Sequence, residues 1–429
     1  MGKSRPAGAR RPADTGKKAM SLSMVPPPFD VDAIRAHFPA LHSGTAFFDS
    51  PGGTQTPREV AAAISNALLA PLANRGLITQ AERNATSIVE QCRTALGDFL
   101  NVHAQTIVFG RSATAITFDL SRTISRTWTE GDEIVVTRLD HNANVQPWLI
   151  AAHRAGAVVR WADFDPETGE LPVDAVREHL TDRTKLVAVT AASNVIGTMP
   201  DIARIADAAH GVGALLYVDG VHYAAHALVD VPALGADVFV CSPYKFLGPH
   251  CAAATLRPDL LEQLQPDKLE ASPNTDPERY ELGTLPYELM AGTTAAIDFI
   301  AAIAGAGGTR RERLARAVEA IDAHETDLRE TIERGLATFE EMTLHSRATH
   351  RSPTLFLSVA GSREKELSRF YASRNINAPA SHFYALDASR RLGLGDDGAL
   401  RVGLAPYNTR EDSDRLLNAT ADFFASRRP

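Results

Sequence analysis

Short apolar runs rich in β-branched residues alternate with helical patterns between residue 57 and about residue 261. The strand-like runs occupy residues 106–110, 133–137, 157–161, 185–190, 214–219 and 238–241, and the helical stretches between them span 113–127, 145–155 and 202–210. The run at 185–190 is almost entirely apolar, as strands buried on both faces are. Strands that alternate with helices predict a mainly parallel sheet covered on both faces.

The pattern changes after residue 292. Helical stretches at 293–304 and 310–335 are followed by a strand-like run at 354–359, a helix at 365–374, a run at 400–404 and a last helix. This mixture predicts a smaller α+β domain. We therefore expect a disordered tail at 1–29, an N-terminal arm at 30–56 packed on the small domain, a large domain at 57–292 and a small domain at 293–429.

Composition excludes several classes of protein. The net charge of −8 argues against a nucleic-acid partner. No apolar run approaches the roughly 20 residues of a membrane span, so no membrane partner is expected. The cysteines, Cys92, Cys241 and Cys251, show neither metal-ligand spacing nor a disulfide framework, and they suit a reducing, cytoplasmic compartment.

The first 24 residues are basic and rich in Gly, Pro and Ala, which is typical of a disordered extension. They lack the apolar stretch of a secretory signal. A transit peptide or a nucleic-acid-binding arm is the alternative interpretation.

Two strand ends carry the side chains with the clearest chemical meaning. One strand ends at Asp219, and another is followed by Ser242-Pro243-Tyr244-Lys245. Ligands bind where loops leave the carboxyl ends of parallel strands, so we expect both side chains at one site. A lysine amine can form a Schiff base with an aldehyde, and an aspartate can keep a pyridine nitrogen protonated. This pair indicates pyridoxal 5'-phosphate as the cofactor.

Taken singly, each residue has a plainer interpretation. An isolated lysine at a strand end is usually exposed, and an isolated aspartate there is usually a turn or cap residue. The order and spacing of Asp219 and Lys245 favour the cofactor role.

A phosphate group needs hydrogen-bond donors from several loops. Arg111-Ser112-Ala113-Thr114 follows a strand and opens a helix, so the amides of the first turn and the Thr114 hydroxyl form an anion site. Ser242 and Tyr244 flank the lysine and can reach the same group. Ser112 or Thr114 can also be a plain helix cap, and capping is compatible with phosphate binding.

Three further polar residues follow strands of the predicted sheet or lie just beyond them. His141 can stack on the face of the cofactor ring, whereas Asn194 and His222 can face its hydroxyl oxygen. Each of them alone would be an ordinary surface or core residue.

Together these segments resemble the class V aminotransferase superfamily of fold-type I pyridoxal phosphate enzymes, and most of all its cysteine-desulfurase-like branch. The resemblance covers about residues 30–425, and it rests on the runs 48–50, 140–141, 192–198, 218–220, 242–245, 283–284 and 401–409. It implies an α/β fold. It further implies that a large domain with a mainly parallel seven-stranded sheet binds the cofactor and that a smaller α+β domain follows it.

The resemblance also implies a role for each matching residue. The implied cofactor-binding set is Lys245, Asp219, His141, Asn194, His222, Ser242, Tyr244, Ala113, Thr114 and Thr284, with Lys245 and His141 as the catalytic residues. Thr284 is implied to reach the phosphate of a neighbouring subunit, which predicts a homodimer with shared active sites. Arg401 is implied to bind the α-carboxylate of a small amino-acid substrate, since its planar guanidinium matches a carboxylate.

The chain departs from the desulfurase pattern at one segment. Desulfurases use a cysteine on a mobile loop of the C-terminal domain, and the matching residues 375–385 contain none. Cys241 belongs to a buried strand, where a thiol is usually inert. A second departure, Leu285-Pro286-Tyr287-Glu288, follows Gly283-Thr284 and indicates a specialised pocket.

These departures predict cleavage of a C–S bond by β-elimination, in cysteine or an S-substituted cysteine, without a persulfide on the enzyme. The chain also resembles class V enzymes of lincosamide antibiotic biosynthesis that process S-cysteine conjugates. Decarboxylation-coupled oxidative deamination of such a conjugate, epimerisation or transamination of an amino acid, and a non-catalytic scaffold are the alternatives.

Overall fold

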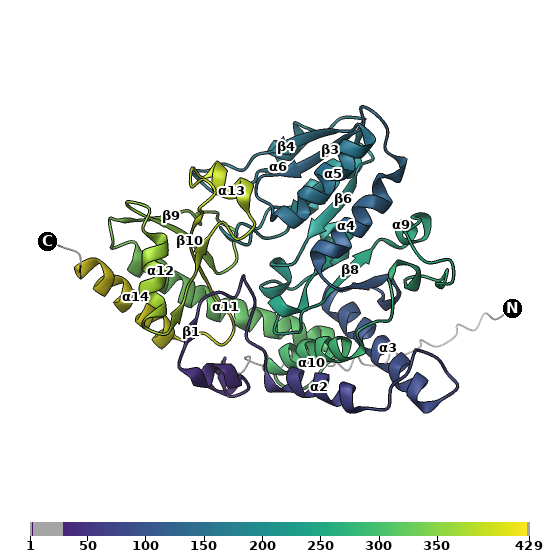
Figure 1. The fold of residues 1–429 in the computed structure, drawn as a ribbon, viewed down its shortest axis with the longest axis horizontal. Coiled ribbons are helices and arrows are strands. Elements are labelled where there is room, and N and C mark those ends of the chain that lie inside the picture. Colours follow the sequence, from purple (N-terminus) through teal and green to yellow (C-terminus); the bar gives the residue numbers. More distant parts are fainter. Residues whose placement is uncertain (1, 3–28, 427–429) are drawn as a thin grey trace.

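The computed structural model describes residue 2 and residues 29–426. The tail expected at 1–29 therefore lies almost entirely outside the described residues. Figure 1 shows a large part built around a twisted sheet, with a smaller part carrying α12 and α14 beside it. Within the described residues no helix has the length and apolar character needed to cross a membrane.

The large part contains a seven-stranded sheet. Its strands are β2 (Ile107–Gly110), β3 (Glu133–Thr137), β4 (Val158–Ala162), β5 (Thr184–Thr190), β6 (Leu215–Asp219), β7 (Val238–Cys241) and β8 (Ala252–Leu256). Their order is β2-β8-β7-β6-β5-β3-β4, and the pairings from β4 to β7 are all parallel. The prediction of a mainly parallel seven-stranded sheet is confirmed. Strand β8, which runs antiparallel to β2 and β7, was not recognised in the sequence.

Helices cover both faces of this sheet, as the alternating pattern predicts. The helices α4 (Ala113–Ile124) and α5 (Gln146–Ala155) pack on one face, where Ile134, Val136 and Tyr217 belong to their apolar cluster. The other face packs against α3 (Gln80–Leu100) and α7 (Ile202–Gly211). Shorter helices follow the strands: α6 (Val173–Arg177), α8 (Val231–Leu234) and α9 (Pro258–Gln263).

Two long helices connect the large part to the small one. Helix α10 (Tyr287–Ile303) packs against α2 (Arg58–Leu69) and α3, and the next helix is α11 (Arg310–Leu336). Leu314 near the start of α11 belongs to the core of the large part, whereas Leu328 belongs to that of the small part. The domain boundary expected at residue 292 falls inside α10, so the division into two domains stays a prediction.

The small part is a four-stranded antiparallel sheet with helices. Its strands are β9 (Met342–Leu344), β10 (Thr354–Val359), β12 (Ala380–Ser381) and β13 (Ala399–Gly403), in the order β12-β13-β10-β9. Its helices are α12 (Glu364–Ala372), α13 (Leu386–Arg391) and α14 (Arg410–Ala425). The sheet, α12 and α14 share one apolar cluster that includes Phe423, whereas Ala388 of α13 belongs to the core of the large part.

The N-terminal arm runs along the small part and then reaches the large one. After α1 (Val31–Arg35), strand β1 (Ala46–Phe47) pairs in parallel with β11 (Ile376–Asn377). The Phe48 carbonyl accepts from the Gly403 amide at 2.8 Å, and the Thr54 amide donates to the Tyr244 carbonyl at 3.0 Å. A Cβ atom at Gly403 would lie 2.2 Å from Pro51 Cδ, so a glycine is needed where the arm crosses β13. The arm therefore brings residues 49–54 between β13 and the loop after β7.

Candidate active site

A cavity of about 940 Å³ opens at the carboxyl ends of β5, β6 and β7. Its walls include nearly every residue that the sequence predicts for the site: Ala113, Thr114, His141, Asn194, Asp219, His222, Ser242, Tyr244, Lys245 and Arg401. Segments that are far apart in the chain are thus brought to one place, as expected for loops that leave parallel strands.

Lys245 lies in a short helical turn directly after β7. Its Nζ atom donates to the Pro51 carbonyl and lies 4.8 Å from the centre of the Tyr244 ring. Burial lowers the pKa of the Lys245 amine from 10.5 to about 7, and the nearby Arg401 charge acts in the same direction. A large share of the amine is therefore neutral near pH 7, which is the form that attacks an aldehyde or takes a proton.

Asp219 is the last residue of β6, next to Val240 of β7 in the register. One carboxylate oxygen accepts from the Val221 amide at 2.9 Å. Burial raises the pKa of Asp219 to about 6, while the Val221 hydrogen bond and the Lys245 charge oppose this shift. A positively charged ring nitrogen facing this buried carboxylate would compensate the cost of its burial.

His141 follows Asp140, a buried residue whose carboxylate accepts from Thr137 and from Asn144 Nδ2. The Ala143 amide donates to His141 Nδ1 at 3.1 Å, so the neutral ring carries its proton on Nε2. Burial lowers the pKa of His141 to about 4, with smaller effects from Lys245, Arg401 and His382. The imidazole is therefore neutral near pH 7, which suits stacking on a cofactor ring.

Three cavity-lining residues hold buried polar atoms that lack a partner among the described residues: Asn194 Oδ1, His222 Nδ1 and Arg401 Nε. His222 Nε2 lies 3.0 Å from Ser352 Oγ and 2.9 Å from Thr354 Oγ1, which leaves Nδ1 as the nitrogen free for another donor or acceptor. An unpartnered buried polar atom is costly, so all three atoms fit a site completed by a polar ligand. The residues present therefore fit pyridoxal phosphate.

Asn194 has a further partner that the sequence did not indicate. Its Nδ2 donates to the Phe383 carbonyl at 2.9 Å. Asn194 therefore uses one of its two amide protons to contact a loop of the small part, and the second is left for a ring oxygen.

The expected phosphate end lies at the start of α4. Ser112 accepts from the Ala115 amide at 3.1 Å and is the N-cap of this helix. The Thr114 side chain is exposed and lines the cavity together with Ser242 and Tyr244. The Tyr244 ring stacks on His250 with centroids 4.8 Å apart and an interplanar angle of 8°, which fixes its orientation. Ser112 is thus the helix cap, and the anion site at this helix start stays a prediction.

Arg401 is buried in the middle of β13, only 2 % exposed. Its Nη2 donates to Asp49 Oδ1 at 2.5 Å, and its Nη1 donates to the Asn194 carbonyl at 3.1 Å. The Phe383 ring lies 3.6 Å from its Cζ atom. Sequence reasoning identified the run Phe48-Asp49-Ser50 only as part of the resemblance and missed that Asp49 is a site residue. An isolated β-bridge pairs the backbones of Asp49 and Gly403, and this pairing brings the Asp49 side chain to Arg401 on β13.

The loop 381–384 also lines the cavity and was not predicted to do so. The Asn142 amide donates to the Tyr384 carbonyl at 2.7 Å. Phe383 and Tyr384 have left-handed backbones, with φ of 48° and 60°. Two successive non-glycine residues in this region are uncommon, and they mark a loop held by its contacts.

The three cysteines lie away from this loop. All are free and buried, and the described lining of the cavity contains none of them. Burial raises the pKa of the Cys241 thiol well above its ordinary value, so this side chain stays protonated.

Thr284 is the one predicted site residue that the structure does not bring to the cavity. It is exposed and lies outside the described lining. Its role at a neighbouring subunit's phosphate stays a prediction.

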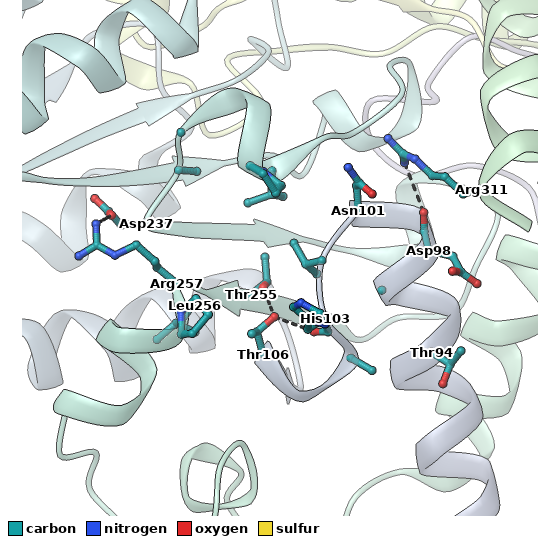
Figure 2. Close-up of a pocket in the computed structure, with 18 of the residues that line it drawn as sticks. Thr94, Asp98, Asn101, His103, Thr106, Asp237, Thr255, Leu256, Arg257 and Arg311 are labelled. Atoms are coloured by element: carbon teal, nitrogen blue, oxygen red, sulfur yellow. Dashed lines mark hydrogen bonds and ion pairs between the residues drawn. The ribbon is translucent and has the colours of Figure 1, made fainter. Parts of the chain in front are cut away.

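A second cavity, of about 730 Å³, lies at the amino end of β7 (Figure 2). Its charged side chains already have partners: Asp237 accepts from Arg257, and Arg311 donates to the backbone carbonyls of Asp98 and Phe99. The Thr106 and Thr255 hydroxyls lie 2.7 Å apart. This arrangement is structural, whereas the cavity around Lys245 holds unpartnered buried groups.

Comparisons with known proteins identify the family of this chain. The family model for aminotransferase class-V matches residues 46–416. An uncharacterized protein, MT3887, of Mycobacterium tuberculosis is 32 % identical over 92 % of this chain and 99 % of its own length. The cysteine desulfurase CsdA of Escherichia coli is 30 % identical over 91 % of this chain and 97 % of its own.

A solved structure of a related protein supports the same family assignment. The crystal structure of Escherichia coli CsdA, in its S-sulfonic acid form, superposes with a TM-score of 0.83 and 26 % identity, covering 93 % of this chain and 100 % of that one. The chain therefore belongs to the class V aminotransferase family, as a fold-type I, pyridoxal phosphate-dependent member of its cysteine-desulfurase-like branch.

Proposed function

We propose that this protein is a C–S lyase that cleaves the Cβ–S bond of cysteine or of an S-substituted cysteine by β-elimination. The products are a thiol or sulfide, pyruvate and ammonia. The observation that carries the proposal is the composition of loop 381–384. It borders the cavity with a serine, an imidazole and two aromatic rings, and it offers no thiol to accept sulfur.

The chain's own residues supply the substrate contacts and the proton transfer. Arg401 would bind the α-carboxylate and so fix the orientation of the bonds at the substrate Cα. The Lys245 amine takes the Cα proton, because its pKa of about 7 makes it a base near neutral pH. Bound pyridoxal phosphate supplies the electron sink for the pair released at Cα.

The state of the thiols supports elimination over persulfide formation. Cys92, Cys241 and Cys251 are buried, and burial raises the pKa of each. A thiolate is the sulfur nucleophile in exchange chemistry, so these side chains are poorly suited to accept sulfur from a substrate.

Three other outcomes start from the same site. Arg401 could instead align the Cα–carboxylate bond, which gives decarboxylation-coupled oxidative deamination, and reprotonation after Cα–H cleavage gives epimerisation or transamination. A scaffold is the least favoured function, because a lysine with a lowered pKa facing a buried aspartate is costly unless it is used.

We infer further that the protein is a cytoplasmic homodimer and that its substrate is a cysteine conjugate of the kind found in antibiotic biosynthesis. Free cysteines suit a reducing compartment. The exposed position of Thr284 leaves it available to a second subunit.

The test offers the purified, cofactor-loaded protein S-methylcysteine, S-arylcysteines, cystine and common amino acids, with product analysis by mass spectrometry. Equimolar thiol and pyruvate support elimination. Release of CO₂ with an aldehyde identifies oxidative deamination, a keto acid that retains sulfur identifies transamination, and a D-amino acid identifies epimerisation. Lys245→Ala is the control, and no thiol from any conjugate would overturn the proposal.

A further inference from the structure

Tyr384 stands at the mouth of the cavity around Lys245. It lines this cavity and is 69 % exposed. The described lining has three other exposed residues, Gly52, Thr114 and Gln146, and none of them carries a ring. The described rim of the cavity therefore has one aromatic ring, that of Tyr384.

Contacts on both sides hold Tyr384 in place. Its carbonyl accepts from the Asn142 amide at 2.7 Å, and its amide donates to His382 Nδ1 at 3.0 Å. The centre of its ring lies 5.5 Å from that of His141 and 6.2 Å from that of His382. The ring therefore lies beside the imidazole that is expected to stack on the cofactor.

The neighbouring ring, that of Phe383, covers the expected carboxylate site. Its centre lies 3.6 Å from Arg401 Cζ, and the Phe383 carbonyl accepts from Asn194 Nδ2 at 2.9 Å. Tyr384 follows Phe383 directly in the chain. The Tyr384 ring is thus next to the place where the amino-acid end of a substrate is expected to bind.

The buried groups of the site direct the side chain of a substrate outward. Lys245 is 9 % exposed and Arg401 is 2 % exposed, so both lie at the floor of the cavity. The Cα atom of an amino acid is tetrahedral. A substrate whose Cα hydrogen meets Lys245 and whose carboxylate meets Arg401 therefore points its side chain away from both, toward the mouth where Tyr384 stands.

The cavity has room for a substrate larger than cysteine. Its volume of about 940 Å³ is near the upper end of the usual range for small-molecule sites. We propose that the substrate is a cysteine whose sulfur carries a flat aromatic group, and that Tyr384 determines this specificity by packing its ring on that group. The proposal rests on the C–S lyase function and names its substrate class.

Analogues that carry a methyl group in place of the Cα hydrogen measure binding without bond cleavage. S-Benzyl-α-methylcysteine and S-(cyclohexylmethyl)-α-methylcysteine are close in size, but only the first has a flat ring. Tyr384→Leu keeps an apolar side chain, and leucine tolerates a left-handed backbone in this protein, as Leu247 shows with φ of 69°. In calorimetric titration of the holoenzyme, this variant should bind the benzyl analogue about 3–10-fold more weakly, the usual size of a ring–ring contact, and the cyclohexylmethyl analogue roughly 2-fold more weakly or less.

Two further variants separate the ring from the rim. Tyr384→Phe retains the ring and should bind both analogues as the parent protein does. Gln146→Ala changes another exposed residue of the rim and should leave the ratio of the two Kd values unchanged. Equal weakening of both analogues by Tyr384→Leu, or weakening of neither, would overturn the role of Tyr384 and leave the lyase function intact. The same conclusion would follow if the parent protein bound the benzyl analogue no more tightly than S-methyl-α-methylcysteine.

Turnover distinguishes this proposal from the function on which it rests. With S-benzylcysteine, Tyr384→Leu should raise KM by about 3–10-fold and change kcat by roughly 2-fold or less, because the ring contributes binding and no proton transfer. A different molecular mass of the variant in solution would assign the ring to a contact between subunits and contradict the proposal. No thiol from S-methylcysteine or S-benzylcysteine with the unaltered enzyme would overturn the lyase function, and this proposal with it.

Discussion

Arg401 Nη2 donates to Asp49 Oδ1 at 2.5 Å, so the guanidinium that is expected to bind the substrate carboxylate already holds a carboxylate of the protein. The Arg401 side chain is 2 % exposed and that of Asp49 is 28 % exposed. Asp49 therefore balances a buried charge in the free protein, and an incoming carboxylate must share or replace it.

Asp49→Asn should lower the stability of the free protein. It should also increase the rise in Tm that a bound substrate analogue produces. Removing one partner of a fully buried ion pair costs about 3–5 kcal/mol, and the partial exposure of Asp49 reduces our expectation to roughly 1–3 kcal/mol. Saturation with S-methyl-α-methylcysteine, which lacks the Cα proton, should raise Tm more in the variant than in the parent protein. Differential scanning calorimetry of the holoenzyme measures both effects.

The matched control is Asp327→Asn. Asp327 pairs with Arg410 at 2.7 Å, but both side chains are more than half exposed. An exposed pair contributes about 0–1 kcal/mol, so this variant should change neither Tm nor the response to the analogue appreciably. Equal responses from both variants would contradict the role given to Asp49.

The Lys245 amine should react at a lower pH than an ordinary lysine. Burial lowers its pKa from 10.5 to about 7, so the neutral amine accumulates up to that pH and no further. In apo-protein treated with a small amine-specific acylating reagent, the rate at Lys245 should rise about tenfold per pH unit below pH 7 and level off above it. Peptide mass spectrometry follows the modification, with the exposed Lys365 as reference. A rate at Lys245 that still climbs at pH 9 would refute the shift.

The raised pKa of Asp219 predicts that the free energy of unfolding of the apo-protein depends on pH. Its folded value of about 6 lies above the ordinary 3.8, so the folded state binds more protons between pH 4 and pH 6. Stability therefore falls as pH rises through this window. Asp219→Asn should stabilise apo-protein by about 1–3 kcal/mol at pH 7 and by much less at pH 4. Urea unfolding at both pH values measures the difference, and Asp207→Asn, at an exposed position, is the control. A gain that is the same at both pH values would argue against ionisation as the cause.

Much of the large part could be predicted because six of the seven strands of its sheet are recognisable by themselves. The run at 185–190 is apolar and β-branched enough to identify β5 to within one residue. Strand β8 was missed because Ala252-Ala253-Ala254-Thr255-Leu256 has little β-propensity, and its strand conformation comes from pairing with β2 and β7. Side chains at the ends of strands line one cavity, because the parallel sheet brings the carboxyl ends of its strands together.

The missed contacts are those made between the two parts. Asp49 and Arg401 are 352 residues apart in the chain, and the arm has to cross β13 before the two side chains meet. His222 contacts Ser352 and Thr354, and these two residues lie on or next to β10 of the small part. No local pattern reports such pairs, because they depend on how the small part sits on the large one.

Close packing behind Asp219 gives a last prediction. A Cβ atom at Gly220 would lie 1.9 Å from Phe239 Cζ and 2.4 Å from Cε2, so this ring must move before an alanine fits. Gly220→Ala should cost about 1–3 kcal/mol in the free energy of unfolding, the usual size of overpacking. It should also weaken cofactor retention, because the displaced backbone carries Asp219. Phe239→Leu removes the obstructing ring, so the double variant should lose less stability than the two single variants added together.

Gly211→Ala is the control, since a Cβ there meets nothing within 4 Å and alanine favours its helix. Strict additivity of Gly220→Ala and Phe239→Leu in urea unfolding would mean that the clash is relieved elsewhere and that the ring does not set the position of the aspartate.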